Sequence, residues 1–188
     1  MYPPPGIQAV IRGSAFANGE RLPSAAVAQQ VSGDVKLTAL GGETRTLAEW
    51  LTTFHLAVVV LDPYTSESAW LLETAGRILM NFREADSRVG WVVTADERDA
   101  RRFLGPWAAD LLTFVDPNRD FVAAVELTRL PALVHIRQDH TVLGVAQGWN
   151  PQEWAGVTEQ LGRIMGWSHP NIPEAGDPGA FEGSPARG

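Results

Sequence analysis

The fold is decided by the stretch Val58-Val-Val-Leu-Asp-Pro-Tyr-Thr-Ser-Glu-Ser-Ala-Trp70. Its first residues belong to an aliphatic run, residues 56–61, which is β-branched at its centre and typical of a strand covered on both faces. Asp62-Pro63 then breaks the strand, and apolar residues recur at helical spacing from Ala69 to about Ala85. Ser66 is the predicted N-cap of this helix. The stretch therefore predicts a central strand, a short turn and a helix.

Strands and helices continue to alternate after this helix. We expect strands at residues 88–94, 111–115, 132–136 and 142–146, and helices at residues 96–104, 119–125 and 151–165. The last two strands are joined through Gln138-Asp-His-Thr141, where His140 falls at a position that favours positive φ. This order predicts an α/β fold with a central mixed sheet and helices on both faces.

The composition divides the chain into three predicted segments. Residues 1–34 are an N-terminal extension rich in Pro, Gly, Ala and Ser. Residues 35–167 are the domain, which opens with a β-hairpin around Gly41-Gly42. Residues 168–188 are a Pro/Gly-rich tail that we expect to be flexible or docked on a partner, with Phe181 as its large anchor.

The composition also excludes several kinds of function. The net charge of −7, with no run of basic residues, disfavours binding to nucleic acid. The longest apolar run is far too short to span a membrane, and no secretory signal is visible, so we expect a cytoplasmic protein. The absence of cysteine excludes disulfides, thiolate metal sites and thiol catalysis, and we expect no cofactor and no metal.

Three features together resemble the thioredoxin-like superfamily, specifically the branch of peroxiredoxins and cytochrome-maturation thioredoxins. They are the order of the elements, the Leu130-Pro131 dipeptide before a hairpin strand, and the stretch Leu37-Thr-Ala-Leu-Gly-Gly-Glu-Thr-Arg-Thr-Leu47. The resemblance covers roughly residues 35–165. In that family the proline before the hairpin strand is cis and faces the redox turn. The resemblance therefore implies a thioredoxin-like fold in which Pro131 is the cis-proline position.

The turn departs from this family at its reactive positions. Ser66 stands where the family has its nucleophilic cysteine, Ala69 stands where it has the second one, and Trp70 follows. Peroxiredoxins support the cysteine with a threonine and an arginine, but Thr65 does not match that spacing and no arginine can be assigned. A serine hydroxyl is far less acidic than a thiol and has no sulfur to exchange. The resemblance thus implies a scaffold without redox activity.

The remaining polar residues near the turn have structural interpretations. Ser66 would need a neighbouring base to act as a nucleophile, and the sequence places no histidine beside it. His135 alternates with apolar residues in a strand and is expected to be partly buried with its hydrogen bonds satisfied. A second hypothesis is that Asp62, Glu67 and Glu73 together bind a cation. Their spacing does not predict that their oxygens converge, so a solvated acidic face is the favoured interpretation.

Tryptophan is unusually frequent, with seven residues in the chain. Trp91 lies in a predicted strand and is assigned to the core. Trp70, Trp149 and Trp154 flank elements near the cis-proline face, where thioredoxins hold extended peptides. Lining of a groove is one interpretation for them, and packing is the favoured one.

The leading functional hypothesis is a redox-inactive, thioredoxin-like protein that binds a protein partner and is not a thiol enzyme. The binding face would comprise the former redox turn and the cis-proline face: Tyr64, Thr65, Ser66, Ala69, Trp70, Leu130 and Pro131. An alternative is a structural subunit of a homo-oligomer or a larger enzyme complex, joined through its terminal arms. A thiol-independent enzyme that uses Ser66 is a third, less favoured hypothesis.

Overall fold

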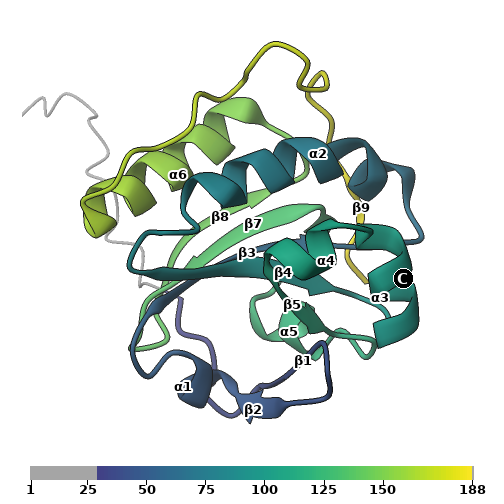
Figure 1. Cartoon of the computed structure of the whole chain (residues 1–188), viewed down its shortest axis with the longest axis vertical. Helices are drawn as coiled ribbons and strands as arrows, with labels where there is room; N and C mark the ends of the chain where they lie inside the picture. The colour runs from purple at the N-terminus through teal and green to yellow at the C-terminus, as the bar shows by residue number, and fades with distance from the viewer. Residues whose placement is uncertain (1–28, 188) are drawn as a thin grey trace, which may run out of the picture.

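A seven-stranded mixed sheet forms the centre of the computed structural model, which describes residues 29–187 (Figure 1). The strand order is β2-β1-β5-β4-β3-β7-β8. The central strand β3 (His55–Leu61) is parallel to β4 (Ser87–Val93) and antiparallel to β7 (Ala132–Ile136). Most of the predicted N-terminal extension, residues 1–34, lies outside the described residues.

The other elements complete the α/β fold that the sequence predicts. They are β1 (Lys36–Ala39), β2 (Thr44–Thr46), α1 (Leu47–Trp50), α2 (Ser66–Asn81), α3 (Glu97–Leu104), α4 (Trp107–Asp110), β5 (Leu112–Val115), α5 (Asp120–Ala124), β6 (Arg129–Leu130), β8 (Val142–Gln147), α6 (Pro151–Met165) and β9 (Ser184–Pro185). The predicted strands and helices are all present, with small shifts at their ends. The short elements α4, β6 and β9 were not predicted.

Helices cover both faces of the sheet, so every residue of β3 is buried (Figure 1). Leu56, Val58 and Val60 join a cluster with residues of α1 and α5. Their neighbours in the strand, such as Val59 and Leu61, join a second cluster with residues of α2, α3 and α6. A continuous aliphatic run is required because successive side chains enter opposite cores.

Helices α1, α3 and α6 begin with side-chain caps. Thr46 and Glu49 form a reciprocal capping box at α1. The Asn150 side chain accepts hydrogen bonds from the backbone at the start of α6, where Pro151 is the first helical residue. The hairpin turns also agree with the sequence, since Gly41 has φ 103° and His140 has φ 68°.

His135 differs from its prediction, because it is completely buried rather than partly buried. Its Nε2 atom lies 3.0 Å from Nδ1 of His55, while its own Nδ1 atom has no hydrogen-bond partner within residues 29–187. Burial, with a smaller contribution from His55, lowers the pKa of His135 to about 4. Burial also lowers the pKa of His55. This pair lies at the start of β3, at the opposite end of the strand from the turn.

Candidate functional site

The turn between β3 and α2 is held by hydrogen bonds to Asp62. The backbone N–H of Tyr64 donates to the Asp62 carboxylate at 3.0 Å, and the backbone N–H of Asp62 donates to the hydroxyl of Ser68 at 2.9 Å. The Thr65 hydroxyl donates to the carbonyl of Asp62 at 3.1 Å. Because Asp62 and Ser68 are both buried, these bonds fix the backbone of the turn.

Ser66 is not the N-cap of α2, which corrects the prediction. Thr65 occupies the cap position with extended backbone angles, and Ser66 is the first helical residue, with an exposed side chain. Ala69 is also exposed. The buried His55 and His135 pair is separated from the turn by the length of β3, roughly 20 Å. This pair therefore supplies no base to Ser66.

An arginine to which the sequence analysis gave no role, Arg119, contacts the turn at Asp62. Arg119 donates from Nη2 to the Asp62 carboxylate at 2.8 Å and from Nη1 to the carbonyl of Ala186 at 2.7 Å. Asp62 is therefore a buried carboxylate in a partly buried ion pair and not part of the solvated acidic face that was predicted. The other two predicted members also have partners, since Glu73 accepts a hydrogen bond from Trp107 and Glu67 accepts a long one from Ser184.

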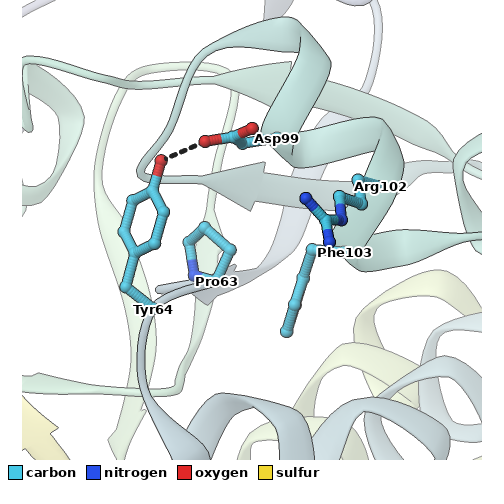
Figure 2. A pocket seen from close by; sticks show the side chains of 5 residues that line it. All are labelled: Pro63, Tyr64, Asp99, Arg102 and Phe103. Carbon is cyan, nitrogen blue, oxygen red and sulfur yellow. Dashed lines mark hydrogen bonds between the residues drawn. The ribbon is translucent and has the colours of Figure 1, made fainter.

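On its α3 side the turn borders a pocket of about 410 Å³ lined by Pro63, Tyr64, Asp99, Arg102 and Phe103 (Figure 2). The Tyr64 hydroxyl donates to the Asp99 carboxylate at 2.7 Å. This hydrogen bond raises the pKa of Tyr64 and lowers the pKa of Asp99. Tyr64 is thus turned toward α3.

The Leu130-Pro131 peptide bond is cis, and Leu130 belongs to the two-residue strand β6. This strand lies outside the central sheet and pairs in antiparallel fashion with β9 of the tail. Leu130 is opposite Ser184 in this pairing. The backbone edge beside the cis-proline is therefore occupied by an extended segment of the same chain.

The tail, residues 168–187, reaches this edge by running along α2 from its C-terminal end to its N-terminal end (Figure 1). The Asn81 side chain donates to the carbonyl of Ser168, and Arg77 forms an ion pair with Asp177 at 2.8 Å. The sequence predicted a tail that is flexible or docked on a partner. The structure instead has it packed on its own domain.

Phe181 is the aromatic anchor of the docked tail. Its backbone exchanges two hydrogen bonds with Trp149, at 2.8 and 2.9 Å, and its ring meets the Trp70 ring edge to face at 5.9 Å. Trp149 and Trp154 are fully buried, as the packing interpretation expects. Trp70 is 60% exposed and leaves an uncovered aromatic surface beside Phe181.

Two glycines allow the tail to approach the domain backbone closely. Gly183 has φ 87°, and a Cβ atom there would lie 2.6 Å from the carbonyl oxygen of Leu130. Gly148 has φ 66°, and a Cβ atom there would lie 2.2 Å from the carbonyl oxygen of Glu182. Neither position accommodates a side chain while the tail is docked.

We expect Gly183→Ala to undock the end of the tail without unfolding the domain. The left-handed backbone costs alanine roughly 1 to 2 kcal/mol, and the overlap with Leu130 adds to this cost. Amide exchange should therefore accelerate at least about tenfold at Phe181 and Ala186, whose N–H groups bond to the domain backbone. Gly179→Ala is the matched control, because a Cβ atom there meets nothing within 4 Å. Equal protection in the two variants would contradict this role of Gly183.

The sequence matches no family model, and no curated protein shows significant similarity to it. Solved structures share its fold at low sequence identity. A protein from Chlorobium tepidum described as a thiol:disulfide interchange protein DsbE has a TM-score of 0.61 at 15% identity, covering 73% of this chain and 97% of its own. A mutant of PrxQ from Xylella fastidiosa has a TM-score of 0.59 at 14% identity, covering 73% and 95%. The bacterioferritin comigratory protein of Xanthomonas campestris has a TM-score of 0.57 at 12% identity, covering 73% and 96%.

These similarities define the fold as thioredoxin-like and confirm the resemblance at the level of fold. This chain has that fold but contains no cysteine, and Ser66 and Ala69 occupy the turn. Within residues 29–187, no three His, Asp or Glu side chains gather as a metal site. None of the helices in this range combines the length and apolar character needed to cross a membrane.

Proposed function

We propose that this chain is a redox-inactive binding module that holds an extended segment of a protein partner along β6. A chain without cysteine has no thiolate for disulfide exchange or peroxide reduction. The observation that carries the proposal is the pairing of β6 with β9, in which an extended segment already uses this edge. Addition of a strand to a free edge is a general mode of peptide recognition, because the backbone supplies the hydrogen bonds.

The side chains around this edge support the same proposal. Trp70 is 60% exposed on the first turns of α2, and tryptophan contributes strongly to binding where a partner buries it. Ser66 precedes it on the exposed side of the turn, whereas Leu130 and the cis Pro131 are buried, so β6 offers its backbone rather than a side-chain surface. None of these groups requires sulfur to hold a peptide.

The other hypotheses receive less support. Assembly through the terminal arms would need a free C-terminal arm, whereas residues 168–187 pack on their own domain. Residues 1–28, the other arm, lie outside the described residues. Catalysis by Ser66 would need a base, and the buried histidine pair is at the far end of β3. The cytoplasmic location stays a prediction.

Selection of peptides on the full chain carrying Gly183→Ala would test this function. A displayed library of random peptides is panned against this variant, and the selected peptides are measured against second-site variants. Trp70→Ala should weaken binding at least about tenfold, because it removes the exposed aromatic surface that contacts Phe181 of the segment paired with β6.

Trp167→Ala is the matched control for this substitution. Trp167 is also exposed, but its indole N–H donates to the carbonyl of Asn81 at the other end of α2. It should leave peptide binding unchanged within about twofold. The proposed function is wrong if no peptide is selected, or if the two tryptophan variants weaken binding equally.

A further inference from the structure

The six tail residues 181–186 lie in different environments beside β6. Each environment limits the kind of side chain that a segment bound in the same place could carry at that position. Two of them, Phe181 and Gly183, are constrained by side-chain packing and by backbone approach. Two others, Ser184 and Ala186, are buried. Glu182 and Pro185 are exposed.

An aromatic side chain is favoured at the first position. The rings of Phe181 and Trp70 form a T-shaped pair with their centroids 5.9 Å apart, and Phe181 packs on the core cluster that contains Trp149. Edge-to-face contact adds to the burial of apolar area, so a small residue at this position loses both. This contact fixes the position of the segment relative to α2.

Glycine is required at the third position. The segment passes between the carbonyl of Leu130 and the Cα atom of Gly148, and a Cβ atom at Gly183 would lie 2.6 and 3.0 Å from them. Both clashes are with backbone, which has no rotamer to change. Residues with side chains are therefore excluded here by both space and positive φ.

Small side chains are favoured at the fourth and sixth positions. Ser184 is 9% exposed between Leu130 and Glu67, and its hydroxyl, which has one proton to donate, lies 3.4 Å from the carbonyl of Leu130 and from the carboxylate of Glu67. Ala186 is fully buried, its N–H donates to the carbonyl of Thr128, and its own carbonyl accepts from Arg119. Larger residues would have no space at these two positions.

The second position has a weaker electrostatic preference. Glu182 forms an ion pair with Arg129 at 2.7 Å, but the two side chains are 76% and 38% exposed. Exposed pairs contribute little, so loss of the carboxylate should weaken binding only about two- to threefold. An acidic residue is thus favoured here without being required.

We propose that the tail is a built-in copy of the partner's segment, which enters β6 antiparallel with the pattern aromatic, acidic, glycine, small, any residue, small. This inference rests on the proposed function and names the class of peptide that the site takes. The tail then competes with the partner, because its tether holds it at a millimolar effective concentration. A partner segment can pair with β6 only in molecules whose tail has left it.

A synthetic peptide of residues 179–187, acetylated and amidated, tests this pattern by titration. It should bind the full chain carrying Gly183→Ala at least about tenfold more tightly than the wild-type chain, because the weakened tail competes less. Phe181→Ala in the peptide should weaken binding at least about tenfold, and Gly183→Ala in the peptide should abolish it. Ala180→Ser, at an exposed position before the pattern, is the control and should change binding less than about twofold.

The outcomes separate this inference from the proposed function. If library peptides bind in a Trp70-dependent way but the tail peptide does not, the inferred pattern is wrong and the proposed function survives. If the tail peptide binds equally with and without Phe181, the pattern is also wrong. If neither the library nor the tail peptide yields binding, both proposals fail.

Discussion

Replacing Asp62 with alanine is expected to lower the free energy of unfolding by about 3 kcal/mol. The carboxylate is buried, accepts from Arg119 at 2.8 Å and accepts from the backbone of Tyr64 at 3.0 Å. Its loss leaves the guanidinium, whose side chain is only 24% exposed, without its counter-charge. It also leaves a backbone N–H of the turn without its acceptor, which adds to the cost.

The measurement is urea unfolding of the full chain, with Glu97→Ala as the matched control. Glu97 forms an ion pair with Arg101 at 2.7 Å, but both side chains are about half exposed. An exposed pair of this kind contributes at most about 0.5 kcal/mol. Similar losses in the two variants would contradict a special role for the Asp62–Arg119 pair.

Asp62→Ala should also loosen the end of the tail. Arg119 holds the carbonyl of Ala186 through Nη1 while Nη2 contacts Asp62, so the ion pair orients the group that binds the tail. Amide exchange at Ala186 should therefore accelerate together with the loss of stability. This coupling would connect the turn after β3 to the docked end of the tail.

The second large effect is a loss of stability in mild acid caused by His135. Its folded pKa is about 4, below the usual value near 6.5 of the unfolded chain. Between these values the unfolded state binds a proton that the folded state does not, so the free energy of unfolding falls as the pH is lowered. Above pH 6.5 the neutral His135 does not lower the free energy of unfolding. When the pH falls from 6.5 to 4, the free energy of unfolding decreases by about 3 kcal/mol.

Urea unfolding at pH 7.5, 6 and 5 would measure this dependence. His135→Leu replaces the imidazole with an apolar side chain that does not titrate, at a fully buried position, and should remove most of the slope. A smaller slope from His55 should persist, because burial lowers its pKa as well. His169→Gln is the control, since His169 is exposed in the tail and its loss should leave the slope unchanged. Equal slopes in wild type and His135→Leu would contradict the assignment.

Much of the fold could be predicted because its long elements carry local signals. The aliphatic run of β3, the helical spacing of α2 and the Gly41-Gly42 turn each depend on residues close together in the chain. The four-residue helix α4 was missed because Gly105-Pro106 indicates a helix end and four residues are too few to show a period. The cap of α2 was misplaced by one residue because Thr65 and Ser66 are both good caps.

The candidate site was only partly predictable. The sequence singled out Trp70, Leu130, Pro131 and Phe181, and the structure brings the tail and the cis-proline loop together. Tyr64 was placed on the same face but contacts Asp99 of α3 instead. Arg119 gave no signal, because a single arginine after a turn does not reveal a partner 57 residues away.

By itself the sequence determined the order of the elements and the absence of cysteine, because periodicity and composition are properties of the chain alone. Only the tertiary structure decided what lies beside the cis-proline. The strands β6 and β9 have two residues each, too few for any pattern, and they form because folding brings a free backbone edge and the tail together. The tail stays there because Gly183 and Gly148 permit a close approach that depends on both partners.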